Sequence, residues 1–181
     1  MLYVIQVLTG KENDIAGKLK ELGIKAYVPK ENRIIRSGGS WTKKEYVLFG
    51  GYVFLNIHYD AETYYKVRNI PAVIRFLGDS SNPSRLSYLE TEWIRLLTGE
   101  DNAPIEPTKV RFLENGEVEI VDGVLEKFKI SKVDKRNRKA VFEITICGEK
   151  KEVQLSVEII DDKQPESRAE ENAAADAAEE E

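Results

Sequence analysis

The segment from Gly99 to Pro107 constrains the fold of this chain most, because the pattern of apolar residues changes across it. The segment is acidic, contains two prolines and has no apolar periodicity, which is typical of a linker. Before it, strand-like and helix-like patterns alternate; after it, short strand-like stretches are separated by turns. The chain is therefore expected to fold as two units, residues 1–98 and 108–161, joined by a linker over residues 99–107.

The first unit has the order of strands and helices that is typical of a split βαβ sheet. A strand and a helix come first, then a hairpin turned by Gly38-Gly39, a further strand, a helix, a strand and a last helix. This order predicts an α+β, ferredoxin-like domain with its helices on one face of the sheet. The strands are expected at Leu2–Leu8, Ile24–Arg36, Trp41–Phe49, Gly51–Ile57 and Val73–Phe76.

Three helix starts carry residues that can cap the first backbone amides. Thr9 with Glu12, and Ser87 with Glu90, have the spacing of a capping box, in which a hydroxyl and a carboxylate each accept from a backbone N–H. Asp60 has the position of an N-cap before a short helix. The helix after Ser87 is expected to share an apolar face made of Leu89, Trp93, Leu96 and Leu97.

The second unit contains five short strand-like stretches in about 50 residues, which predicts a small β-barrel. The strands are expected at Val110–Phe112, Gly116–Ile120, Lys129–Val133, Ala140–Ile146 and Glu152–Leu155. The barrel core is expected to consist of Val118, Ile120, Ile130, Val133, Val141, Ile144 and Val153.

The formal net charge of −5 hides an uneven distribution. Residues 161–181 hold nine acidic residues against two basic ones, so the rest of the chain is slightly basic. Residues 162–181 also lack bulky apolar side chains and are expected to be disordered. Two basic stretches, residues 30–44 and 127–139, contain a single acid each. Such stretches are typical of phosphate-binding surfaces, although solvated loops and strand faces have the same composition.

The sequence offers few residues for enzymatic chemistry. His58 and Cys147 are the only histidine and the only cysteine, and they fall in different units without metal-ligand spacing. The chain is therefore expected to be a non-enzyme that binds no cofactor or metal. A lone cysteine permits no internal disulfide, and no apolar run is long enough to span a membrane. We expect a cytoplasmic monomer that does not bind membranes.

Several motifs point to a known protein family. In the first unit they are Tyr3-Val4, the turn with Gly10 and Glu12, Phe49 before Gly51-Tyr52-Val53, and Val73–Gly78. In the second they are Gly123–Leu125, Ile130–Asp134, the basic turn Lys135–Lys139, and Val153–Leu155. On these motifs the chain resembles the NusG family of transcription elongation factors, in which an NGN domain precedes a five-stranded, SH3-like KOW barrel. The barrel motif around Lys132-Val133-Asp134 is most similar to LoaP, a group of operon-specific antiterminators.

The resemblance implies a protein that binds RNA polymerase. Family members dock an apolar pocket of the NGN domain on the clamp helices of the largest polymerase subunit, which favours processive elongation and antitermination. Aromatic anchors in such a pocket supply most of the binding energy, although the same side chains could instead fill the domain core. The matching residues here are Tyr3, Phe49, Gly51, Tyr52, Ile70 and Phe76.

The resemblance to LoaP also implies binding of a nascent RNA hairpin, and upstream DNA is a further expected partner. The barrel has two open roles, as an adaptor for a termination factor or a ribosomal protein, or as a direct RNA binder. A ribosome-associated KOW protein that binds RNA, and an enzyme on a ferredoxin-like fold, remain alternatives. The candidate nucleic-acid-binding residues are Arg33, Arg36, Lys43, Lys44, Thr63, Lys66, Arg68, Lys132, Lys135, Arg136, Arg138 and Lys139.

Overall fold

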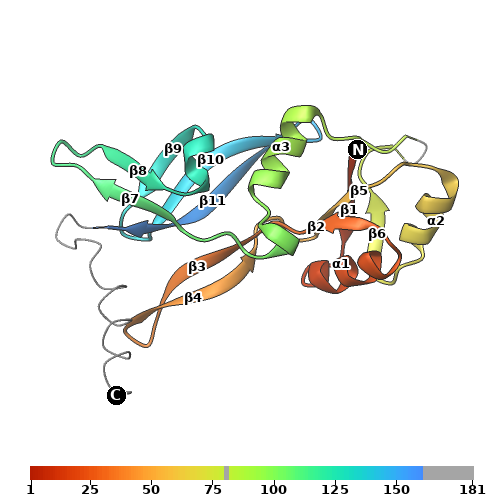
Figure 1. Ribbon diagram of the computed structural model, residues 1–181, viewed down its shortest axis with the longest axis horizontal. Coiled ribbons are helices and arrows are strands. Elements are labelled where there is room, and N and C mark those ends of the chain that lie inside the picture. The colour runs from red at the N-terminus through yellow and green to blue at the C-terminus, as the bar shows by residue number, and fades with distance from the viewer. Residues whose placement is uncertain (80–81, 161–181) are drawn as a thin grey trace, which may run out of the picture.

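The computed structural model describes residues 1–79 and 82–160, and it shows two lobes connected by a short segment (Figure 1). The end of the chain for which we expected disorder, residues 162–181, lies outside the described residues. A long hairpin leaves the first lobe and runs alongside the second (Figure 1).

The first lobe is an α+β domain built on one antiparallel sheet. The strand order β2-β5-β1-β6 places β1 at the centre, antiparallel to β5 and β6. This arrangement confirms the α+β split-sheet fold. The elements are β1 (Leu2–Val7), α1 (Glu12–Glu21), β2 (Lys25–Tyr27), β5 (Tyr52–Asn56), α2 (Ala61–Arg68), β6 (Val73–Phe76) and α3 (Tyr88–Leu96).

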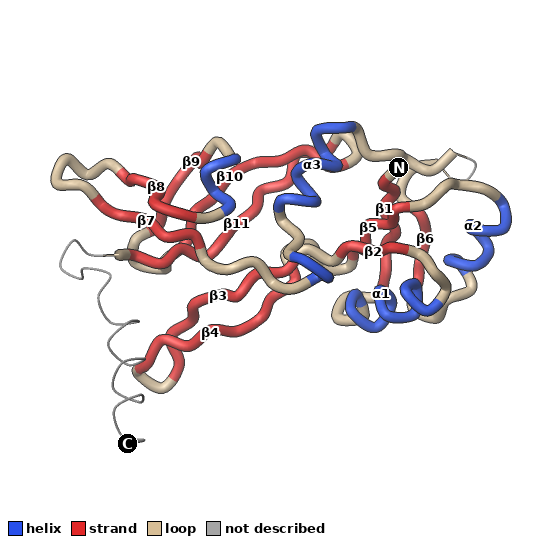
Figure 2. The backbone as a smooth tube through the Cα atoms, viewed as in Figure 1, coloured by secondary structure: helices blue, strands red, loops and turns tan. Residues whose placement is uncertain are grey.

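Both faces of this sheet are buried, because its central strands are apolar on both sides. Alternate residues of a strand point to opposite faces. In β1, Ile5 packs in a core with residues of α1 and α2, whereas Val4 packs in a second core with α3 and the barrel. The expectation that all helices share one face is therefore wrong: α3 and the barrel cover the face that α1 and α2 leave open (Figure 2).

The projecting hairpin consists of β3 (Lys30–Ser37) and β4 (Ser40–Val47), which pair along their whole length. Gly38 and Gly39 form its turn, with φ angles of 59° and 87°. Two consecutive positive φ angles define the type I′ turn that suits the twist of a tight hairpin, which explains the two glycines.

The second lobe, which we call the barrel, is a curved five-stranded sheet in the order β8-β7-β11-β10-β9. Its longest strand, β11, was expected only over Glu152–Leu155. Every second residue of β10 faces inward, so Phe142 and Ile144 are buried while Val141 is not, and the prediction of Val141 as a core residue is wrong. The strands are β7 (Thr108–Phe112), β8 (Val118–Asp122), β9 (Ile130–Asp134), β10 (Lys139–Ile146) and β11 (Glu149–Ile159).

The capping box before α3 is confirmed. The Ser87 hydroxyl accepts from the Glu90 backbone N–H at 3.3 Å, and the Glu90 carboxylate accepts from the Ser87 N–H at 2.7 Å. The apolar face expected for this helix is wrong in part, because Leu89 and Leu96 are 62% and 39% exposed. The buried face instead runs through Glu90, Ile94 and Leu97. Glu90, whose carboxylate caps the helix, therefore also occupies a buried position.

The capping box expected at Thr9 and Glu12 does not form, because Lys11 is the N-cap of α1 and makes no side-chain cap. The Glu12 carboxylate is 3% exposed and accepts from the Gly10 N–H at 3.1 Å and from the Gly51 N–H at 2.6 Å. It therefore ties the start of α1 to the turn that leads into β5.

Replacing Glu12 by alanine should lower the free energy of unfolding by about 2 kcal/mol, because two backbone N–H groups lose a charged acceptor and one of these bonds is buried. Urea denaturation measures the loss. Glu21→Ala, at an exposed position of the same helix, is the control and should change stability by no more than about 0.5 kcal/mol. Equal stabilities of the two variants would contradict this role of Glu12.

Candidate functional site

A hollow of about 550 Å³ lies at the entrance to β5, where the chain leaves the hairpin and joins the sheet. We call it the socket. Phe49 is 9% exposed, and its ring meets Phe54 edge-on with a centroid distance of 5.7 Å. Tyr52 is half-buried and, with Leu77, completes the apolar wall that the first domain contributes.

Gly51 holds the two aromatic residues in this arrangement. Its φ angle is 82°, a value that other residues adopt with strain, and a Cβ here would lie 3.3 Å from the Thr9 hydroxyl oxygen. Its N–H donates to Glu12, and the Tyr52 N–H donates to the Phe49 carbonyl at 3.1 Å. The predicted Gly51 is thus a positioning residue for the socket.

The other residues expected to bind polymerase lie elsewhere. Tyr3, Ile70 and Phe76 are buried in the core that α1 and α2 cover, on the opposite face of the sheet from Phe54. The ring of Tyr3 packs on Tyr59 at 5.5 Å. Their positions indicate packing roles, and none of the three lines the socket.

The barrel supplies the remaining wall of the socket. Ile146, Cys147 and Glu149, around the β10–β11 turn, line the hollow opposite the aromatic residues. The Gly148 N–H of this turn donates to the Glu90 carboxylate at 3.3 Å, which fixes the turn beside α3. The barrel thus forms one side of the socket beside Phe49, and we call this arrangement of the two domains closed.

The rate at which the Cys147 thiol is alkylated reports on its environment in this wall of the socket. Burial, with smaller contributions from the carboxylates of Glu90 and Glu149, raises the pKa of its thiol to about 11. At pH 8 the reactive thiolate is then about 200-fold scarcer than for a free cysteine, and alkylation by iodoacetamide should be slower in proportion. Because raising the pH forms thiolate, the rate should rise about tenfold per pH unit from 8 to 10. A plateau near pH 9 would contradict the raised pKa.

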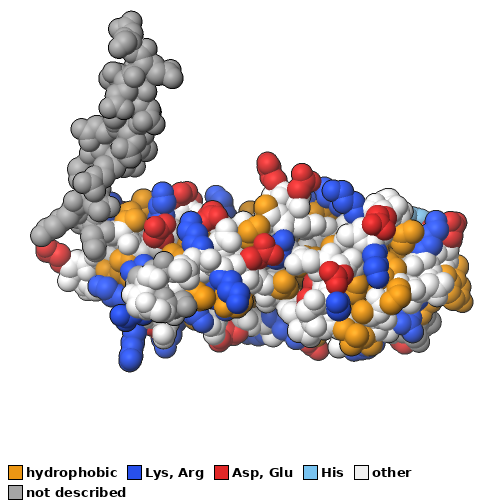
Figure 3. Space-filling model, turned by 90° about the horizontal axis from the view of Figure 1, so that it is seen from below, with side chains coloured by type: hydrophobic (Ala, Val, Ile, Leu, Met, Phe, Trp, Pro, Cys, Tyr) orange, Lys and Arg blue, Asp and Glu red, His pale blue; other side chains and the backbone are white. Residues whose placement is uncertain are grey.

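A second hollow, of about 430 Å³, lies between the hairpin and the barrel, and we call it the basic groove. Arg33 and Arg36 of β3 line one side, and Arg136 and Lys139, at the β9–β10 turn, line the other. The structure therefore brings together four of the candidate nucleic-acid-binding residues. Figure 3 shows the molecule from below, with Lys and Arg side chains standing out from the lower left edge of the view.

The other candidate nucleic-acid-binding residues on the hairpin and the barrel lie outside the basic groove, each in its own environment. Lys43 donates to the Glu106 carboxylate at 2.8 Å, and this hydrogen bond raises the pKa of the lysine. The Lys44 ammonium lies 5.8 Å from the centroid of the Tyr46 ring. On the barrel, Lys135 lies 4.7 Å from the ring centroid of Phe112, while Lys132 lines a separate hollow and Arg138 is half-buried.

The candidates on α2 are distant from the basic groove, since α2 lies at the opposite end of the molecule (Figure 1). Lys66 pairs with Glu62 at 2.6 Å, and Arg68 donates to the Ile74 carbonyl at 2.6 Å. The Thr63 N–H donates to the Asp60 carboxylate, which confirms Asp60 as the N-cap. The contacts of Arg68 and of the Thr63 amide belong to the structure of this end of the domain.

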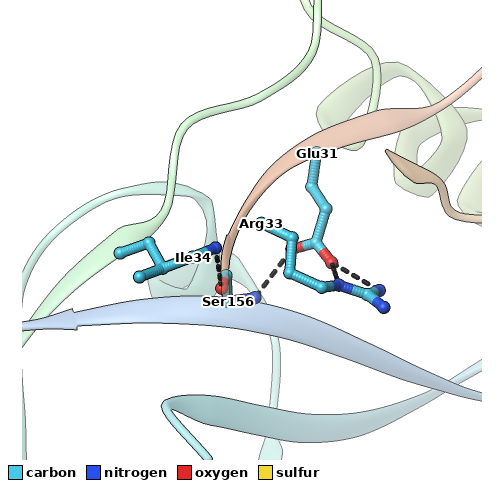
Figure 4. A network of polar contacts seen from close by, with 4 residues as sticks. All are labelled: Glu31, Arg33, Ile34 and Ser156. Carbon is cyan, nitrogen blue, oxygen red and sulfur yellow. Dashed lines mark hydrogen bonds and ion pairs between the residues drawn. The ribbon is translucent and has the colours of Figure 1, made fainter. Parts of the chain in front are cut away.

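A buried polar network that joins the two domains was not predicted. Glu31 is 2% exposed and accepts from the Ser156 N–H at 2.7 Å and from the Arg33 guanidinium at 2.6 Å (Figure 4). The Ser156 hydroxyl in turn accepts from the Ile34 N–H at 2.9 Å. We call these residues the interdomain network. The only signal in the sequence was a lone acid within the basic stretch over residues 30–44.

The two lobes and the hollows between them define a two-domain protein. Among residues 1–79 and 82–160, no cluster of three or more His, Cys, Asp or Glu residues could hold a metal ion. No helix in the same part of the chain is long and apolar enough to cross a membrane.

A family model described as "Transcription termination factor nusG" matches residues 2–95, just over half of the chain. The chain therefore belongs to the NusG family of transcription termination and antitermination factors. It is 30% identical over 163 residues to the "Transcription termination/antitermination protein NusG" of Helicobacter pylori strain J99, covering 81% of this chain and 89% of that protein. The homologous protein of strain 26695 is 28% identical over 166 residues, covering 84% and 93%.

A solved structure supports the same fold. The structure described as "Domain interaction in Thermotoga maritima NusG" is 24% identical, covers 86% of this chain and 93% of that chain, and superposes with a TM-score of 0.52. At this identity the match supports the arrangement of strands and helices and carries no inference about partners.

Proposed function

We propose that this protein is a transcription elongation and antitermination factor that binds the clamp helices of RNA polymerase through the socket. The observation that carries the proposal is the hollow beside Phe49 and Tyr52, the aromatic pair that the family resemblance assigns to polymerase binding. A helical partner could bury its apolar side chains against these rings, and aromatic side chains in a concave site are typical of binding hot spots. Recovery of purified RNA polymerase by the wild-type chain, and not by a chain without the two rings, tests the proposal.

The closed arrangement requires that the barrel move before polymerase binds. The β10–β11 turn lines the socket, and residues of both domains share one apolar cluster. Polymerase would bind only the open form, so the apparent affinity for polymerase would be proportional to the fraction of molecules that are open.

The basic groove and the neighbouring lysines support a contact with nucleic acid. We propose a structured nascent RNA as this partner and, on the resemblance to LoaP, an operon-specific role. Duplex RNA is recognised mainly through its shape and backbone, for which clustered Arg and Lys side chains suffice. The barrel, once released, would be free to contact a termination factor or a ribosomal protein.

A further inference from the structure

The two walls of the basic groove come from segments about 100 residues apart in the chain. β3 supplies one wall, and the β9–β10 turn supplies the other. Each wall alone would be an exposed cationic surface, of the kind that solvated strands and loops often carry. Only their juxtaposition makes a hollow with cations on both sides.

The interdomain network sets this juxtaposition. Ser156 pairs with Lys139 in the β10–β11 ladder, and the same serine accepts from the Ile34 N–H of β3 and donates to Glu31. The contacts that close the two domains therefore lie directly beside the groove. If the barrel moved away, Lys139 would move with it and the groove would cease to exist.

The groove is strongly cationic. Its lining includes four basic side chains and no acidic one, together with Tyr46 and Asn137. Two features hold Arg33 in place: its ion pair with Glu31, and the Tyr46 ring, whose centroid lies 4.4 Å from the guanidinium carbon. Arg36 and Arg136 are exposed, one on each wall. A linear polyanion between the walls could contact both domains at once.

We propose that the closed arrangement of the two domains creates a composite site for the phosphodiester backbone of a double-stranded nucleic acid, contacted by Arg36 from one domain and by Arg136 and Lys139 from the other. This inference deepens the proposed RNA contact and rests on it. It adds that both domains bind one ligand and that this ligand favours the closed form.

The first test measures the affinity of the full chain for a fluorescent RNA hairpin at several salt concentrations. Arg36→Glu and Arg136→Glu should each weaken binding about tenfold, the double variant about 100-fold, and the salt dependence should become shallower with each lost phosphate contact. Lys18→Glu/Lys20→Glu makes the same charge change at exposed positions of α1 and should leave the affinity within about twofold.

A DNA duplex of the same sequence identifies which backbone is preferred, and either duplex supports the proposal. Equal affinity for polyglutamate of matched charge would overturn it in favour of an acidic peptide. If the wild-type chain binds RNA but the groove variants bind equally well, the composite site is overturned while the RNA contact stands. If the wild type binds neither duplex, both fail, and polymerase binding remains a separate question.

The second test asks whether the ligand bridges the domains. The amides of Ile34 and Ser156 form hydrogen bonds only across the domain contact, so their hydrogen exchange reports opening. A ligand that binds only the closed form, present at ten times its dissociation constant, should slow both exchange rates about tenfold. The Thr63 amide, bonded within its own domain, is the control and should not change. Unchanged exchange at Ile34 and Ser156 with RNA bound would overturn the composite site.

Discussion

Replacing Phe49 and Tyr52 by alanine should abolish recovery of RNA polymerase by the tagged protein. Each ring in a polymerase-binding hot spot contributes about 2 kcal/mol, so the two together are worth roughly a thousandfold in affinity. The same rings belong to the apolar cluster that both domains share, so their removal should loosen the closed arrangement, which alone would favour binding. A loss of binding would therefore assign the rings to the polymerase contact. Purified core polymerase and a pull-down with quantified recovery make the measurement.

Phe49 is nearly buried, so its truncation is expected to cost about 3 kcal/mol of stability. The half-buried Tyr52 gives a milder variant: Tyr52→Ala alone should weaken binding about 30-fold while its thermal unfolding stays cooperative. Tyr65→Ala is the matched control, because this tyrosine is 62% exposed on α2, away from the socket. Undiminished recovery by a folded Tyr52→Ala chain and by the double variant would remove the proposed contact.

Replacing Ser156 by valine should raise the affinity for RNA polymerase about tenfold. Valine lacks the hydroxyl oxygen and offers no acceptor, so the Ile34 N–H is left unpaired when the domains are closed. An unpaired buried donor costs about 1–3 kcal/mol, and in the open form water satisfies the group. The substitution therefore destabilises the closed form selectively and increases the open fraction that polymerase can bind.

Adding Glu31→Ala should increase the effect further, because the Ser156 N–H and Arg33 also lose their acceptor in the closed form. Ser131→Val is the control: its hydroxyl donates to the Val141 carbonyl inside the barrel, at 2.8 Å, and does not contribute to the domain contact. Binding of core polymerase by biolayer interferometry distinguishes the cases. If Ser156→Val and Ser131→Val bind as the wild type does, the barrel does not control access to the socket.

Local chemistry predicted much of the fold. Ser87 and Glu90 form the expected capping box because both partners lie within one helical turn and need no distant residue. The same spacing failed at Thr9 and Glu12, because the helix begins only after Lys11 and the carboxylate accepts from Gly10 and from Gly51, which is far along the chain. Spacing along the sequence reveals local competition for a side chain, but it does not reveal competition from residues that only tertiary structure brings close.

The candidate site could be predicted as a set of residue types, but not as an arrangement. Phe49 and Tyr52 were singled out from a family motif, yet nothing in their neighbourhood indicated that Ile146 and Cys147 would face them. Basic clusters were visible in the sequence because they are contiguous. The sequence did not show that these clusters line one groove, because the groove depends on how the barrel packs against β3. That packing involves Ser156, which has no distinctive sequence signature.

The segment between the domains limits what opening can achieve. Asn102 bonds to Val28 and Ala26 of the first domain, Ile105 exchanges backbone hydrogen bonds with Lys30 and Asn32, and Glu106 pairs with Lys43. The linker thus travels with the first domain almost to Pro107, directly before β7 begins.

A barrel released on so short a tether would remain at an effective concentration in the millimolar range beside the surface it left. Any molecule that keeps the barrel away from the first domain must therefore compete with repeated rebinding of the barrel to that domain within the same chain.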